Sequence, residues 1–301
     1  MKQQEIISKK EFIEFYEPLL KAYSENFKKE IASQDFMCDL LFAENDEINI
    51  SKIHNIIETH KDVYIKSFLY RLLGTREIIF CRENDLLFEL KEVWKLISNS
   101  IRLIPSTYII SSIGSQGFLS IPLYKKDEKL ENFDFLRLHI WDDSLDEYMD
   151  LKKVDDFSIH SHTFFAKSWV ITGKIINDRF EYIKDSKKAK HSFFKVVYND
   201  SLNEVNQHTS KAVNKKIDAE LIKISEELHL KNAVYEIKPS KLHKSGHKNS
   251  PKCSATFFSF TGKDGLGESF VIGPKSINES EVNRKMNIAP QYLLDKIDSQ
   301  L

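Results

Sequence analysis

Two histidines separated by a single residue, His160 and His162, have the spacing in this chain that most directly suggests chemistry. In an extended strand, residues two apart point to the same side. Two imidazoles on one side of a strand can bind one metal ion at roughly 2.0–2.2 Å. The alternative is a pair on a solvent-facing strand, but the apolar residues at 164–165 and 169–171 favour an interior position.

Such a pair is only half of a metal site, so a third ligand must come from another part of the chain. His243 follows a short apolar run at 234–237 and precedes a second one at 253–260, which places it next to predicted strands. His247 lies close by and could compete for the same role. The sequence therefore predicts a three-histidine metal site with His243 as the third ligand.

These residues resemble motifs of the cupin superfamily. The histidine pair, then ten residues and Gly173, is similar to the first cupin motif, and His243 stands where the second motif has its histidine. The chain also resembles cysteine dioxygenases, which have an apolar strand ending in tryptophan (here Trp141) and then Ile-His-x-His-Thr (here 159–163). The likeness covers about residues 130–275. It implies an RmlC-like jelly roll that holds a mononuclear metal.

The sequence departs from the family pattern at residues that would bind the metal or the substrate, which limits the kind of site and substrate that the resemblance implies. Cupins often have a glutamate that follows the second histidine after three or four intervening residues, but here those positions are Ala166 and Lys167. This leaves a three-histidine site, as in thiol dioxygenases, and not two histidines with one carboxylate. The Ser-x-His-x-Tyr arrangement of thiol dioxygenases falls on Ser254, Thr256 and Phe258, of which only the serine matches. The resemblance therefore does not carry over cysteine as the substrate.

The resemblance implies an oxidoreductase, a dioxygenase with Fe(2+) as cofactor, and Zn, Ni and Mn are the alternative metals. Its partners would be dioxygen and a small molecule that is thiol-containing or acidic, because three neutral imidazoles leave the charge of the metal uncompensated and favour an anionic ligand. Two other functions stay open, since a fold does not dictate a function. One is another metal-dependent cupin enzyme, such as an isomerase, a decarboxylase or a biosynthetic tailoring enzyme. The other is a non-enzymatic cupin that binds a small molecule.

Further residues could line the site. Arg137 shares strand parity with His139 and Trp141, so it could face the cavity and hold a substrate anion; a surface arginine is the alternative. Tyr235 could also line the pocket, with core packing as the alternative. We interpret His139 as a core histidine and Cys253 as a small buried apolar residue. Arg137 and Tyr235 are therefore our candidate catalytic residues besides the metal ligands.

The elements that must position these residues differ along the chain. Residues 1–105 have apolar residues at helical spacing and predict an α-helical lobe, including a helix over 62–73 that should end at Gly74. Residues 106–275 consist of short β-branched and aromatic runs separated by turn signals, which predicts the jelly-roll domain. The stripe of apolar residues at 217–228 predicts one helix inside that domain.

A helical tail is expected over residues 276–301, which makes the fold mainly β with an N-terminal α-helical lobe and α+β overall. The 301 residues include 41% apolar residues, enough for a buried core.

Charge, cysteine content and hydropathy exclude several classes of protein. The 44 Lys and Arg residues nearly balance the 45 Asp and Glu residues, so no nucleic-acid partner is expected. The three cysteines form no CxxC pair, which argues against a disulfide framework. The sequence shows no signal-peptide pattern and no apolar stretch of about 20 residues, so we expect a cytoplasmic protein without a membrane partner. Pairing into a homodimer through sheet edges is left open.

Overall fold

The computed structural model of the protein describes residues 5–113, 116–127, 129–198, 208–247, 250, 252–285 and 288–301. The chain divides into two compact units, which comprise Met1–Ile109 with Leu123–Lys126 and Ile110–Pro122 with Asp127–Leu301. The domain limits predicted at 105/106 and 275/276 stay predictions.

The first unit contains helices and a small antiparallel strand pair. Its elements are β1 (Ile6–Ser8), α1 (Lys9–Leu20), α2 (Phe27–Glu30), α3 (Gln34–Phe42), β2 (Glu47–Asn49), α4 (Ile50–Thr59), α5 (Val63–Glu83), α6 (Leu90–Arg102) and the 3-10 helix η1 (Ser106–Tyr108). The Asp62 side chain accepts hydrogen bonds from the amides of Tyr64 and Ile65, so α5 begins where the sequence predicts. The predicted end at Gly74 is wrong. A Cβ at Gly74 would lie 2.7 Å from Cδ1 of Ile97 in α6, so glycine allows these two helices to pack closely.

The second unit is dominated by antiparallel strands. Its elements are β3 (Ser112–Ile113), β4 (Leu119–Lys126, shared with the first unit), η2 (Leu130–Asn132), β5 (Asp134–Trp141), η3 (Asp143–Tyr148), α7 (Leu151–Asp156), β6 (Ile159–His160), β7 (Phe164–Thr172), β8 (Lys174–Lys184), β9 (His191–Tyr198), β10 (His208–Leu230), β11 (Val234–Ile237), β12 (Leu242–Gly246), β13 (Ser254–Leu266), β14 (Val271–Pro274), β15 (Glu279–Lys285) and α8 (Gln291–Asp298). The chain is therefore α+β with a large antiparallel sheet, and the jelly-roll topology stays a prediction.

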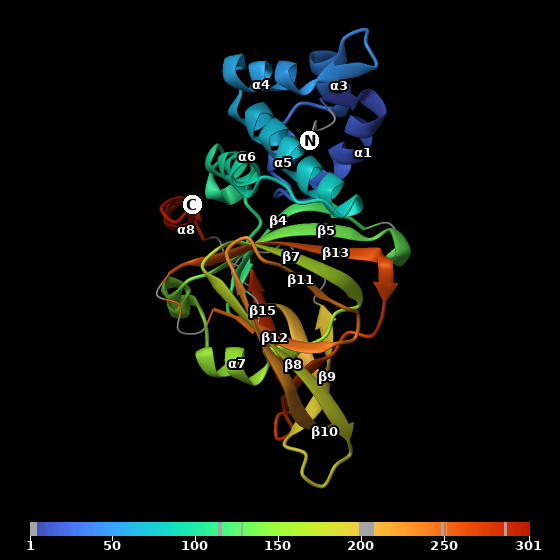
Figure 1. The fold of residues 1–301 in the computed structure, drawn as a ribbon, viewed down its shortest axis with the longest axis vertical. Coiled ribbons are helices and arrows are strands. Elements are labelled where there is room, and N and C mark those ends of the chain that lie inside the picture. Colours follow the sequence, from blue (N-terminus) through green and yellow to red (C-terminus); the bar gives the residue numbers. More distant parts are fainter. Residues whose placement is uncertain are drawn as a thin grey trace. The chain divides into compact units, whose positions relative to one another are not determined.

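Among the described residues, these strands form one thirteen-stranded sheet in the order β11-β7-β13-β5-β4-β3-β15-β10-β8-β12-β6-β14-β9. β9 also pairs with β10, so the strands from β10 to β9 in this order close on themselves. Figure 1 shows β8, β9 and β10 running side by side, and β5, β13 and β7 following one another in the same unit. Closure of this kind removes exposed sheet edges.

The helix predicted over 217–228 is wrong, because these residues belong to the long strand β10. The strand pairs with β8 from Ala219 to Leu230 and with β9 from Ser210 to Ala219. The apolar residues of the predicted helical stripe do not share one environment: Ile217 and Leu221 pack against a buried cluster, whereas Ile224 is 54% and Leu228 59% exposed. Backbone pairing along the whole segment overrides the helical spacing. The expected helical tail is also only partly present, because β15 precedes α8.

One cluster of buried side chains comes from β5, β7, β8, β11 and β13. Its members are Trp141, Ala166, Val170, Ile175, Tyr235, Ile237 and Phe258. Phe118, Ala233 and Phe260 pack against it. Packing within this cluster fixes the strands that lie next to the predicted metal site.

Candidate metal centre

His160 and His162 occupy the end of β6 and the position two residues beyond it. The side chain of His160 is 8% exposed and that of His162 is half-buried. Residues at this spacing in extended backbone project to one side. The two imidazole centroids lie 4.6 Å apart, so the two rings lie on the same side of the chain as the sequence predicts.

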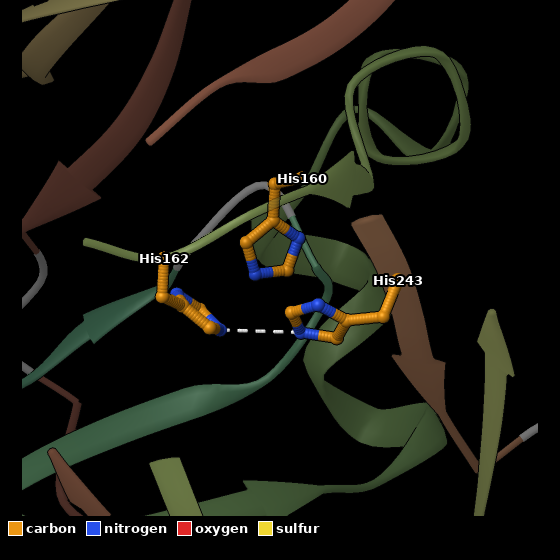
Figure 2. A group of neighbouring side chains, drawn as sticks. All are labelled: His160, His162 and His243. Atoms are coloured by element: carbon orange, nitrogen blue, oxygen red, sulfur yellow. Dashed lines mark hydrogen bonds between the residues drawn. The ribbon is translucent and has the colours of Figure 1, made fainter. Parts of the chain in front are cut away.

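His243 joins this pair through the backbone register. Strand β12 pairs with β6 so that His243 lies directly opposite His160. Side chains at opposite positions of an antiparallel pair lie on the same face, with Cβ atoms about 4.5–5.5 Å apart. The His243 ring centroid is 4.3 Å from that of His160 and 4.7 Å from that of His162. The sheet therefore brings the three predicted residues together (Figure 2).

The three rings direct ligand atoms toward a common point. One nitrogen from each ring lies within 4.8 Å of the others, and Nε2 of His162 is 3.2 Å from Nε2 of His243. Two nitrogens that are each about 2.1 Å from one ion, at an angle of about 90–110°, are separated by about 3.0–3.4 Å. The 3.2 Å separation fits coordination of one ion by His162 and His243 together.

Backbone carbonyls set the orientation of two rings. Nδ1 of His160 lies 2.8 Å from the carbonyl oxygen of Ser158, and Nδ1 of His243 lies 3.3 Å from the carbonyl oxygen of Lys241. A carbonyl oxygen can only accept, so each Nδ1 carries the proton and donates. Nε2 then keeps its lone pair, which is the form that a metal ligand requires.

The electrostatics of the cluster also favour neutral rings. Burial lowers the pKa of His160 to about 4, although the bond to the Ser158 carbonyl acts in the opposite direction. Burial, followed by the charges of neighbouring histidines, lowers the pKa of His162 and His243 well below the ordinary value. Neutral imidazoles need not release protons before a metal binds. The site is therefore prepared for a cation at neutral pH.

Within the part of the chain that the structure describes, no carboxylate belongs to this group. Ala166 lies in the apolar cluster, and the ammonium of Lys167 lies 3.4 Å from a carboxylate oxygen of Glu236. His247, the alternative third ligand, is outside the cluster, with Nε2 3.5 Å from a carboxylate oxygen of Asp143. The cluster therefore offers three nitrogens, and their role as metal ligands stays a prediction.

Arg137 lies on the inner face of β5. It pairs with Phe258 across the ladder to β13, and its guanidinium carbon is 4.3 Å from the centroid of the Phe135 ring. Its positive charge contributes to the lowered pKa of both His162 and His139, which places it near the histidines. It is thus a cation near His162 and His139.

Tyr235 is buried, and its ring stacks on that of His229 at a centroid distance of 4.3 Å. Burial raises the pKa of Tyr235 to about 12, so the phenol keeps its proton. Cys253 is also buried, and burial raises the pKa of its thiol to about 12. A protonated thiol is a poor nucleophile, which agrees with its interpretation as an apolar residue.

Sequence reasoning did not identify the aromatic wall beside the histidines. The ring centroid of His162 lies 4.7 Å from that of Phe260 and 6.0 Å from that of Phe258. These phenylalanines alternate along β13, and the same-face spacing of two residues was the available signal. These two rings pack against His162.

A search of the described residues finds no helix with the length and hydropathy needed to cross a bilayer. Comparison with protein-family models gives no match, and comparison with curated proteins gives none either.

Three solved structures are similar to parts of the chain. Hydroquinone 1,2-dioxygenase from Sphingomonas sp. TTNP3 with 4-hydroxybenzoate bound is 8% identical over 45% of this chain, with a TM-score of 0.23; the match spans 64% of that enzyme, under two thirds of its length. Hydroxypropylphosphonic acid epoxidase from S. wedmorenis is 11% identical over 70% of this chain and 95% of that one, with a TM-score of 0.26. FeII HppE is 8% identical over 81% and 97%, with a TM-score of 0.28. TM-scores of this size do not establish a shared fold.

Proposed function

We propose that this protein is a mononuclear non-heme iron dioxygenase of the cupin type, which acts on a small acidic or thiol-containing molecule. The observation that carries the proposal is the convergence of His160, His162 and His243, with Nε2 of His162 3.2 Å from Nε2 of His243. The proposal includes a jelly-roll domain over residues 106–275 and a helical lobe before it.

The donor set fits a divalent metal and an anionic substrate. Three neutral imidazoles would hold the ion without compensating its charge, so an anionic group such as a carboxylate or thiolate would bind favourably beside it. Ferrous iron, when bound, supplies redox chemistry toward dioxygen. Imidazole ligands also suit Zn, Ni and Mn to different degrees, so the metal needs a direct test.

The residues around the three rings would bind and orient the substrate. Arg137 would attract its anionic group and fix its direction. Phe258 and Phe260 would exclude water from the reacting centre, which strengthens electrostatic interactions inside it. A catalytic role for Tyr235 stays a prediction, because its ring stacking and high pKa are also those of a packing residue.

Oxygen uptake tests this proposal. Wild-type protein loaded anaerobically with Fe(II) is mixed with air-saturated buffer and a panel of small thiols and carboxylates in an oxygen electrode. We expect at least one compound to give steady oxygen consumption, and His243→Ala to reduce the rate at least about 100-fold. His247→Ala is the matched control and should keep the wild-type rate.

Two results would contradict the proposal. One is an equal rate in wild type and His243→Ala. The other is turnover of the active compound with Zn(II) alone and without oxygen consumption, which would favour another metal-dependent cupin enzyme. Arg137→Gln should raise the KM for an anionic substrate about tenfold or more while leaving iron binding unchanged.

A further inference from the structure

The inner face of β5 carries a buried histidine that the metal site does not use. His139 is 4% exposed and lies two residues from Arg137 on one side and from Trp141 on the other, so all three project from the same face. In the ladder to β13, His139 lies directly opposite Thr256. Its position is therefore fixed by a central strand and not by a loop.

Two aromatic rings hold the His139 imidazole in one orientation. Its centroid lies 4.1 Å from that of Phe118 at an interplanar angle of 29°, and 4.8 Å from that of Phe258 at 24°. The ring is thus clamped between two nearly parallel faces. Phe258 also lies 6.0 Å from the ring of His162, so a single side chain separates His139 from the metal ligands.

The polar atoms of this wall lack protein partners. Nε2 of His139, Nε1 of Trp141 and Oγ1 of Thr256 are all buried, and none of them has a hydrogen-bond partner among the described residues. A buried polar group without a partner costs about 1–3 kcal/mol, so native proteins rarely keep three on one face. Each such group calls for a partner, and a bound ligand is one that would supply it.

The chemistry of these atoms restricts the ligand. Burial, together with the charge of Arg137, lowers the pKa of His139 well below its ordinary value, so the imidazole is neutral. A neutral imidazole, an indole N–H and a hydroxyl complement an uncharged polar group such as a hydroxyl, a carbonyl or an amide. Because these three groups carry no net positive charge, they would not attract a second anionic group of the substrate.

We infer that His139, Thr256 and Trp141 form a subsite that hydrogen-bonds a neutral polar group at the end of the substrate opposite its anionic group. This inference rests on the proposed function. The substrate class is then a small anion with a flat apolar middle that packs on Phe258. Because Arg137 and His139 are two residues apart in a strand, their Cα atoms lie about 7 Å apart, which suits a small substrate.

Calorimetry with a matched pair of probes tests the subsite. Phenylacetate and 4-hydroxyphenylacetate differ only in a neutral hydroxyl at the end opposite the carboxylate. Each is titrated into Fe(II)-loaded protein under argon, and iron is quantified in every sample. We expect wild type to bind the hydroxylated probe about tenfold more tightly, which corresponds to one well-formed hydrogen bond.

His139→Phe keeps a flat ring in the clamp and removes its polar nitrogens. We expect it to bind both probes within about twofold of each other, while its affinity for phenylacetate stays within about threefold of wild type. His139→Gln should recover part of the preference because its amide can hydrogen-bond. His229→Phe, another histidine stacked on an aromatic ring, is the control and should keep the full preference.

Thermal unfolding separates a ligand site from a structural role. Replacing a histidine with an unpartnered buried nitrogen by phenylalanine should leave the Tm of the ligand-free protein unchanged or higher. A fall of more than about 5 °C in Tm for His139→Phe would assign the histidine to the core and overturn the inference.

Equal binding of the two probes by wild type, weak binding of both, or a preserved preference in His139→Phe would also overturn the inference. Absence of iron in the wild-type sample would instead overturn the proposed function, so the two failures are distinguishable.

Discussion

Acidification of the metal-free protein should destabilise it by an amount that the burial of His160 determines. In an unfolded chain the pKa of a histidine is about 6.5, whereas burial lowers the pKa of His160 to about 4 in the folded protein. Above pH 6.5 the ring is neutral in both states and the free energy of unfolding does not depend on it. As the pH falls below 6.5, the unfolded chain binds a proton that the folded protein does not, so stability is lost until the pH approaches 4.

The size of this loss follows from the two pKa values. At about 1.4 kcal/mol for each pH unit, the interval from 6.5 to about 4 corresponds to about 3 kcal/mol in total, of which about 2 kcal/mol is lost by pH 5. His162 and His243 should add losses of the same sign, because burial also lowers their pKa values.

Urea unfolding at pH 7, 6 and 5 in the presence of a chelator measures the effect. The comparison protein is His160→Gln, which cannot titrate in this range but keeps a polar side chain of similar size. We expect wild type to lose about 2 kcal/mol more than His160→Gln between pH 7 and pH 5. The other titrating groups are present in both proteins, but the variant also loses the effect of His160 on the pKa of His162 and His243, so the measured difference includes that contribution. An identical pH dependence in the two proteins would refute the reasoning, since His160 would then have an ordinary pKa.

Two further predictions concern residues that support the site. Gly173 has a φ of +70°, and a Cβ there would lie 2.2 Å from a serine hydroxyl oxygen, so Gly173→Ala should lower the free energy of unfolding in urea by about 2–4 kcal/mol. Gly246→Ala is the control, because no atom lies within 4 Å of its Cβ, and it should cost less than about 1 kcal/mol. Equal losses in the two variants would contradict this prediction. Burial acts to raise the pKa of Asp142, but hydrogen bonds, chiefly from Lys296, outweigh it and lower the pKa, so the stability from this pair is present above about pH 4 and is lost as the pH falls below that. Lys296→Ala should therefore lower the free energy of unfolding by about 1–3 kcal/mol at pH 7 and by less at pH 3. Lys275→Ala, which removes an exposed ion pair, is the control and should change the free energy of unfolding by under about 0.5 kcal/mol. A loss for Lys296→Ala that does not depend on pH would contradict this account.

The sequence was sufficient to predict the His160 and His162 pair, because the relative direction of these two side chains depends only on local backbone geometry. The alternation of side chains in a strand directs His160 and His162 to one side without information from distant residues. His243 was harder to predict, because its distance from the pair depends on the register between β6 and β12. Two apolar runs flanking His243 were the signal that placed it near a strand, and the register then brought it opposite His160.

Other features depend on long-range packing that local patterns do not encode. The residues at 217–228 have helical apolar spacing but form part of β10, because β8 and β9 supply backbone partners along that strand. Glycine commonly follows the end of a helix, but Gly74 lies inside α5, where the absence of a Cβ allows close packing against α6. His139 was interpreted as an ordinary core histidine. Only the three-dimensional arrangement shows that its Nε2 is buried without a partner among the described residues.

Metal content measured on single-histidine variants tests the central claim most directly. Wild type, His160→Ala, His162→Ala, His243→Ala and the control His247→Ala are loaded with Fe(II) under argon, desalted and assayed for iron by elemental analysis. We expect about one iron per chain in wild type and in His247→Ala, and at least about tenfold less in each of the other three variants. Iron retained at the wild-type level in those three variants would contradict the account, because the ion would then bind elsewhere.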